Sequence, residues 1–223
     1  MSAQFNAPDK FFTATFNAGT TVKAPESDYD RKLKPDSWGE ALHDAADRGE
    51  VPRKAVPVMM VDYMGPSLDT MIFAITSAVW LFAQHLSMGL GAREPEAIPS
   101  AVNEVLRMEA PIQDFSRYAV EEFDMDGVTL PADSRAIVFY GAANRDEREY
   151  PDPDRFEVRR NPTNHMAFGT GPHVCLGQYL ARLEMTSLFT ALARRVRRFE
   201  LGDSERALHN ILRGFTKLHV TVS

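Results

Sequence analysis

One cysteine dominates the chemistry that this sequence can offer. Cys175 is the only cysteine among 223 residues, and it lies in the glycine-rich run Phe168-Gly169-Thr170-Gly171-Pro172-His173-Val174-Cys175-Leu176-Gly177. The glycines let the backbone turn tightly and approach a flat ligand closely. An amphipathic segment begins near Leu176, and the positive end of a helix at that point favours the ionised thiolate. The pattern therefore predicts a thiolate held against a metal.

A cysteine in a glycine-rich run can also be a purely structural feature. A lone cysteine is often a small buried apolar residue, and glycine-rich runs are often plain turns. Among metals, zinc suits the sequence less well, because it takes several closely spaced Cys or His ligands and this chain has one Cys and six scattered His.

The run resembles the haem-binding loop of the cytochrome P-450 family, which reads Phe-Gly-x-Gly-x-His-x-Cys-x-Gly. This resemblance implies haem b (iron protoporphyrin IX) as the cofactor and the Cys175 thiolate as the proximal ligand of its iron. It also implies that the loop residues Phe168, Gly169, His173 and Gly177 contribute to cofactor binding.

A second motif lies in a predicted helix over residues 98–109. Glu104 and Arg107 are three residues apart, so they share one helix face and can form an ion pair. Such a pair is more often a solvated surface feature. The resemblance implies instead a buried, structural cluster, completed by Arg155 from the segment Tyr150-Pro151-Asp152-Pro153-Asp154-Arg155-Phe156. Removal of one member of such a cluster strands a buried charge.

A third motif, Asp69-Thr70, stands among apolar residues between positions 61 and 75. Polar groups are expensive to bury, so they usually have partners or a chemical role. Asp and Thr also favour helix starts, whereas Pro66 and the apolar neighbours favour a distorted helix interior. By resemblance, Asp69 and Thr70 are the catalytic acid and alcohol that relay protons to dioxygen. Pro66-Ser67 departs from the Ala-Gly or Gly-Gly that is commoner in the family.

Two cations are candidates for binding the carboxylates of the cofactor. Arg117 follows the Glu-x-x-Arg helix at the distance where the resembled family often places a propionate-binding Arg, and His173 offers a second donor. The alternative for Arg117 is a solvated charge in a loop. A further group of cations, Arg194, Arg195, Arg197 and Arg198, either complements a helix end or forms a docking patch for an acidic electron carrier.

The elements that position these residues follow from periodicity and turn signals. We expect a long central helix over 55–85, the helix over 98–109, short antiparallel strands within 118–140, the cysteine loop over 168–177 and a helix over 177–199. Leu180, Leu183, Leu188, Leu192 and Val196 are expected to form the apolar face of the last helix. Residues 1–37 show no clear periodicity, and residues 86–92 read as a loop, a deletion or a local frame error. The predicted fold is mainly α with small antiparallel β-sheets, corresponding by resemblance to the C-terminal half of the P-450 fold.

Composition limits the class of protein further. The sequence is 44% hydrophobic and 25% charged, which is typical of a soluble globular domain. A net charge of −6 argues against nucleic-acid binding by bulk attraction. The start of the chain lacks a signal-peptide pattern, and the apolar stretch 71–83 is shorter than the roughly 20 residues that span a bilayer. We therefore expect a cytoplasmic protein that binds no membrane.

Taken together, the motifs predict a haem-dependent monooxygenase of the soluble bacterial type. It is expected to hydroxylate a small organic substrate with dioxygen and two electrons, supplied by a separate ferredoxin or flavoprotein. At 223 residues the chain is short for the resembled family, so we expect a truncated or fragmentary chain. The alternative is a noncatalytic, incomplete haem-binding fragment.

Overall fold

A computed structural model describes residues 34–85 and 94–223. The patch at 86–92 and most of the N-terminal segment 1–37 lie outside these described residues. The contacts between residues define two compact units, and the boundary between them lies inside one long helix. The described residues up to Asp69 form one unit, and those from Thr70 onward form the other.

The first unit contains α1 (Trp38–Asp47), a 3-10 turn (Arg53–Ala55) and the first part of α2 (Val56–His85). The hydroxyl of Ser37 caps α1 by accepting the N–H of Glu40 at 3.2 Å. Pro66 lies inside α2, where it removes one backbone donor without ending the helix. Because α2 begins at Val56, Asp69 and the following residue lie in the helix interior and do not cap a helix start.

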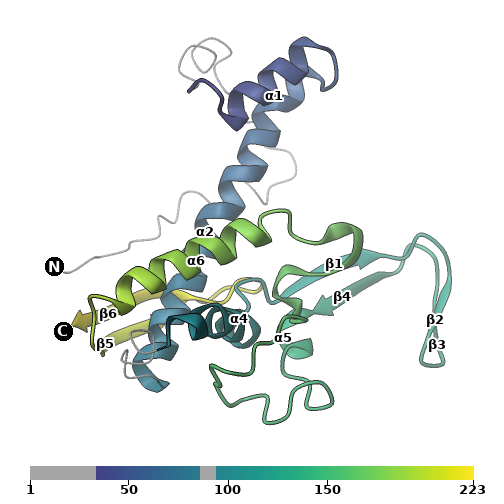
Figure 1. Ribbon diagram of the computed structural model, residues 1–223. Coiled ribbons are helices and arrows are strands. Elements are labelled where there is room, and N and C mark those ends of the chain that lie inside the picture. The colour runs from purple at the N-terminus through teal and green to yellow at the C-terminus, as the bar shows by residue number, and fades with distance from the viewer. Residues whose placement is uncertain (1–33, 86–93) are drawn as a thin grey trace. The chain divides into compact units, whose positions relative to one another are not determined.

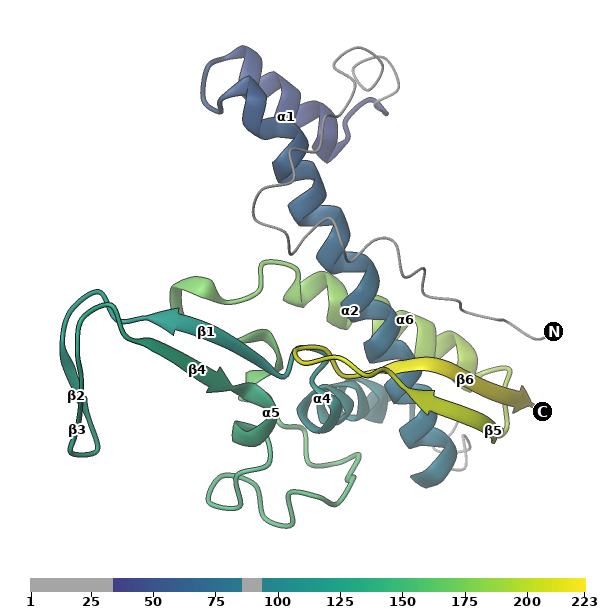
Figure 2. The same cartoon turned by 180° about the vertical axis from the view of Figure 1, so that it is seen from behind.

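The second unit combines helices with small antiparallel sheets, which confirms the predicted fold class. Its helices are the rest of α2, α4 (Ile98–Glu109), the short α5 (Tyr140–Ala143) and α6 (Gln178–Ala193). Three two-stranded antiparallel sheets occur among the described residues: β1 (Asp114–Tyr118) with β4 (Arg135–Phe139), β2 (Phe123–Met125) with β3 (Val128–Leu130), and β5 (Phe199–Arg206) with β6 (Phe215–Val222). In both views α4 lies between the β5–β6 hairpin and the β1–β4 sheet (Figures 1 and 2).

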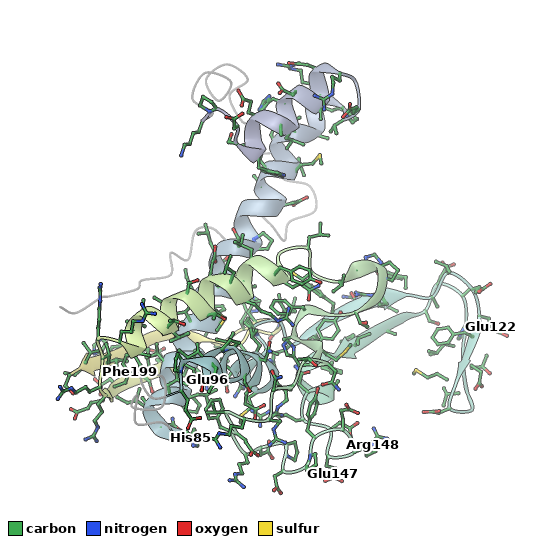
Figure 3. The ribbon with its side chains drawn as sticks, viewed as in Figure 1. His85, Glu96, Glu122, Glu147, Arg148 and Phe199 are labelled. Carbon is green, nitrogen blue, oxygen red and sulfur yellow. The ribbon has the colours of Figure 1, made fainter. Side chains whose placement is uncertain are left out.

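The core of this unit forms where α2, α4 and α6 meet. The Phe82 ring of α2 packs edge-on against the Phe189 ring of α6, with centroids 4.9 Å apart. All of α4 from Ala101 to Glu109 is buried, so this helix forms the centre of the unit. Figure 3 shows Phe199 at the start of β5, whereas Glu122 lies on the outlying β2–β3 hairpin.

The last helix differs from the prediction in both its length and its buried face. α6 ends at Ala193 instead of 199, because Arg197 and Arg198 donate their backbone N–H groups to the Ser223 carbonyl at 2.7 and 3.2 Å. Its buried residues are Met185, Phe189 and Ala193, spaced by four. Leu180 and Leu183 of the predicted apolar face are exposed. The leucines recur at irregular spacing, so they do not follow one side of the helix as the buried residues do.

A buried ion cluster, distinct from the predicted Glu-x-x-Arg cluster, attaches the β5–β6 hairpin to α4. The Glu109 carboxylate is buried and accepts from Arg206 Nη1 and, at 3.2 Å, from Arg213 Nε. The Arg206 guanidinium lies over the rings of Trp80 and Phe215, 4.6 and 3.9 Å from their centroids. A Cβ on Gly214 would collide with the Phe73 ring, so only glycine fits there. No motif in the sequence predicted this cluster.

One described helix, Arg53–His85, is long and apolar enough to cross a membrane when judged by length and composition alone. The core helix of a soluble protein passes the same test. In its second half Ala74, Ala78, Leu81 and Phe82 are buried in the core. This part of α2 therefore packs as a core helix.

Candidate functional site

The loop that carries Cys175 is shaped by its glycines and by one backbone hydrogen bond. After the 3-10 turn at Met166–Phe168, Gly169 and Gly171 adopt φ values of 67° and 70°. Residues that carry a side chain rarely adopt this backbone conformation. The Cys175 N–H then donates to the Phe168 carbonyl at 2.9 Å, which closes the loop. The Cys175 side chain is exposed. The fold therefore presents this thiol to a ligand and does not pack it as a core residue.

The thiol lies next to the first turn of α6. Gly177 is the N-cap of this helix, and a Cβ placed on it would lie 3.8 Å from Cys175 Sγ. The first N–H groups of a helix have no intrahelical acceptor and carry the positive end of its dipole. The Cys175 sulfur therefore lies at the positive end of the α6 dipole.

Arg182 of α6 supports the start of the loop. Its guanidinium lies 4.5 Å from the centroid of the Phe168 ring, and its Nε donates to Asn103 Oδ1 of α4 at 3.1 Å. Beside it, burial together with the positive charge of Arg182 lowers the pKa of His165 to about 4, so this imidazole is neutral at pH 7. His165 Nδ1 accepts the Ala167 N–H at 3.2 Å. Sequence reasoning missed both residues, although Arg182 lies seven positions after the cysteine, on the helix that begins there.

The β1–β4 sheet brings Arg117 to the same loop through a tyrosine. Arg117 Nη2 donates to Tyr140 Oη at 3.1 Å, and Arg117 Nη1 donates to the Ser116 carbonyl at 3.0 Å. Tyr140 Oη lies 3.6 Å from the place that a Cβ on Gly169 would take. Arg117, predicted to donate hydrogen bonds to a carboxylate of the cofactor, and the glycine-rich loop therefore both lie next to the Tyr140 hydroxyl. His173, the second predicted donor, is exposed in the same loop.

The Glu-x-x-Arg pair is buried, but its third partner is Arg160 and not Arg155. Glu104 and Arg107 are both 0% exposed and form two hydrogen bonds of 2.8 and 2.9 Å. Arg160 Nε donates to Glu104 Oε1 at 3.0 Å. Arg155 is exposed and contributes its backbone carbonyl, which accepts from Arg160 Nη2 at 3.2 Å. The path of the backbone explains the difference: the chain turns at Asp152, where φ is 50°, and it is the later arginine that reaches back to Glu104.

Comparison with known proteins identifies the fold that these residues build. The family model for Cytochrome P450 matches residues 97–221, more than half of the chain. The chain belongs to the cytochrome P450 family.

Individual relatives agree with this assignment. The chain is 33% identical to Cytochrome p450 CYP199A2 of Rhodopseudomonas palustris over 86% of this chain and 47% of that protein. It is 41% identical to 6-deoxyerythronolide B hydroxylase of Saccharopolyspora erythraea over 60% of this chain and 34% of that protein. Among solved structures, CalO2 superposes with a TM-score of 0.74 at 32% identity, covering 81% of this chain and 46% of that one. The chain thus spans less than half the length of these P450 relatives.

Cytochrome P450 proteins bind haem b, and the described residues suit such a ligand. Haem is a flat apolar plate with two carboxylates. The exposed Cys175 thiol is followed by Leu176, which is 95% exposed, and Leu183 of α6 is 62% exposed. Arg117 and His173 add groups that can bind carboxylates. An exposed thiol, uncovered apolar side chains and nearby cations together fit the P450 cofactor.

Asp69 and Thr70, the predicted catalytic pair of the P450 chain, are consecutive residues inside α2. Burial raises the pKa of the Asp69 carboxyl above its usual value. Asp69 belongs to the first unit, whereas Thr70 and the cysteine loop belong to the second. Their catalytic roles stay predictions.

Proposed function

We propose that this chain is the haem-binding part of a monooxygenase that hydroxylates a small organic substrate with dioxygen and two externally supplied electrons. The observation that carries the proposal is the exposed Cys175 at the end of a glycine-shaped loop and at the N-terminus of α6. The name of the Saccharopolyspora erythraea relative describes that protein as a hydroxylase, which supports the same reaction class here.

In this proposal the residues of the loop hold and orient the cofactor. Cys175 is the one protein ligand of the iron, and Phe168, Gly169 and Gly177 give the loop its shape. Arg117 and His173 bind the propionates by charge-assisted hydrogen bonds. When bound, haem would supply the chemistry that activates dioxygen. Donation of electron density by a thiolate ligand favours that chemistry.

Asp69 and Thr70 are proposed to deliver protons to dioxygen during the reaction. A carboxyl whose pKa is raised by burial keeps its proton to a higher pH than a solvated one, so Asp69 can act as an acid nearer neutrality. The Thr70 hydroxyl follows it in the chain and can both donate and accept a proton.

The electron donor is proposed to be a separate ferredoxin or flavoprotein. Arg194, Arg195, Arg197 and Arg198 follow the end of α6 and form a local basic cluster in a chain whose net charge is −6. Such a cluster steers acidic partners. Since the second half of α2 packs as a core helix, we further propose that the protein is soluble, acts in the cytoplasm and binds no membrane.

The test replaces the proposed ligand. Cys175→Ser, made in the full chain with haem supplied, is expected to abolish the red-shifted Soret band of the ferrous carbonyl complex. Ser204→Ala, at an exposed position of β5, is the matched control and is expected to keep that band. Persistence of the band in Cys175→Ser contradicts the assignment.

A second candidate function is haem binding without turnover. It is favoured by the coverage of the relatives, since the chain spans 47% of the Rhodopseudomonas palustris protein and 34% of the Saccharopolyspora erythraea one. Peroxide-driven hydroxylation by the haem-loaded chain separates the two candidates. Product formation supports the monooxygenase, and stoichiometric haem with no product supports the second candidate.

A further inference from the structure

Tyr140 is a buried residue near the cysteine loop that neither the motifs nor the proposed function uses. It begins α5, and its side chain is 4% exposed. Its hydroxyl oxygen accepts from Arg117 Nη2 at 3.1 Å. No acceptor for the proton of this hydroxyl occurs among the described residues. A hydroxyl can donate as well as accept, so its proton is available to an acceptor atom of a ligand.

The surroundings of the hydroxyl show where that ligand atom would lie. A Cβ on Gly169 would be 3.6 Å from Tyr140 Oη and 3.8 Å from the His173 carbonyl oxygen, so the hydroxyl lies directly against the loop. Phe115 packs against the Tyr140 ring, with centroids 6.2 Å apart and planes at 80°. Phe115 and Arg117 are alternate residues of β1 and therefore share one face of the sheet. The tyrosine thus joins β1 to the cysteine loop.

Arg117 keeps spare hydrogen-bonding capacity in this arrangement. A guanidinium has five N–H donors, and the described contacts of Arg117 are with the Ser116 carbonyl and the Tyr140 hydroxyl. Both contacts fix the orientation of the planar group. A carboxylate that approached it could accept from Arg117 and from the Tyr140 O–H together.

We propose that Tyr140 and Arg117 form one carboxylate-binding unit, in which the tyrosine orients the guanidinium and donates its own proton to the same carboxylate. This inference rests on the proposed function, which identifies that carboxylate as a haem propionate. Tyr140 is accordingly a binding residue of the cofactor as well as a positioning residue for Arg117.

A purely structural role for Tyr140 makes a different prediction. If the ring only supports Gly169 and Phe115, removal of its hydroxyl changes the affinity for every porphyrin by the same factor. If the hydroxyl binds a propionate, its removal weakens binding most when the carboxylates are free, because a neutral ester accepts a weaker hydrogen bond than a carboxylate. The two roles are separated by a porphyrin whose propionates are blocked.

The experiment titrates the full chain with haem and, separately, with haem dimethyl ester, and follows the absorbance of the bound porphyrin. Tyr140→Phe keeps the ring and removes the hydroxyl. We expect it to weaken haem binding about tenfold, the size of one hydrogen bond to a charged group, and to weaken binding of the neutral ester much less. Tyr118→Phe, on the same sheet and 67% exposed, is the control and is expected to change neither affinity.

A double-mutant cycle tests the unit directly. Arg117→Gln combined with Tyr140→Phe is expected to weaken haem binding by less than the product of the two single effects, because each variant already disables part of one unit. Equal losses for haem and its ester, or no loss in Tyr140→Phe, would overturn the inference and leave the proposed function standing. Failure of the wild-type chain to bind either porphyrin removes the proposed function, and the inference with it.

Discussion

The buried Glu104 cluster allows a quantitative test of which arginine completes it. The perturbation is Arg160→Ala, and Arg155→Ala, five positions earlier and exposed, is the matched control. The two substitutions remove the same side chain from the same segment. They differ in whether the guanidinium reaches a buried carboxylate.

The magnitude follows from the contacts that Arg160 makes. It donates to Glu104 Oε1 at 3.0 Å and to the backbone carbonyls of Pro151, Asp152 and Arg155 at 2.6, 3.1 and 3.2 Å. All four bonds have the charged guanidinium as donor, and a hydrogen bond that involves a charged group contributes about 1.5–3 kcal/mol. Breaking one partner out of a buried ion cluster typically costs about 3–5 kcal/mol. We therefore expect Arg160→Ala to lower the free energy of unfolding by about 3–5 kcal/mol, whereas Arg155→Ala stays within about 0.5 kcal/mol of the wild type.

The assay is urea unfolding of the full chain, with the transition midpoint and the slope m measured for all three proteins. A total stability of about 5–15 kcal/mol is usual for a domain, so the expected loss in Arg160→Ala is easily visible. Equal midpoints for the two variants, or a larger loss in Arg155→Ala, would refute the assignment of Arg160. A changed m in Arg160→Ala alone indicates that the segment it holds unfolds separately.

Three further perturbations have expected outcomes. The pKa of His165 is about 4 in the folded state and about 6.5 when unfolded, so its neutral form contributes stability that is complete above pH 6.5 and is lost as the pH falls toward 4. Across this range the stability of the wild type is expected to fall more steeply with pH than that of His165→Gln, and parallel curves would contradict this. Gly214→Ala places a methyl group inside contact distance of the Phe73 ring and is expected to cost about 1–3 kcal/mol in thermal unfolding, a value that an unchanged melting temperature would disprove. Asp69→Asn and Thr70→Ala are expected to spare haem binding and to lower the ratio of hydroxylated product to released peroxide, and an unchanged ratio in both removes these residues from the mechanism.

The sequence was most informative where the chemistry is local. The spacing within the cysteine loop depends on residues at most nine positions apart, and the Glu-x-x-Arg pair occupies one helix face, so both could be anticipated from the chain alone. The identity of the third arginine could not, since it depends on how the segment after Tyr150 turns back. Choosing between Arg155 and Arg160 requires the path of that backbone.

The same distinction explains the supporting residues that were missed. Tyr140 meets Arg117 only because β1 and β4 pair, and Arg182 meets Phe168 only because α6 packs beside the loop. The end of α6 was misplaced because Arg194 to Arg198 are compatible with a helix, while backbone bonds to Ser223 draw part of that segment toward β6. Local propensity is a weak guide wherever a distant segment supplies the hydrogen-bond partners.

The Glu109 cluster also sets an order of assembly. Its arginines, Arg206 and Arg213, are 97 and 104 residues further along the chain. At about 5–20 residues per second of synthesis, the carboxylate emerges about 5–20 s before either partner exists. During that interval α4 cannot close around Glu109 without burying an uncompensated charge, so water has to remain in contact with the end of the helix. Burial of Glu109, and with it of the C-terminal end of α4, is therefore expected only after the β5–β6 hairpin has been synthesised.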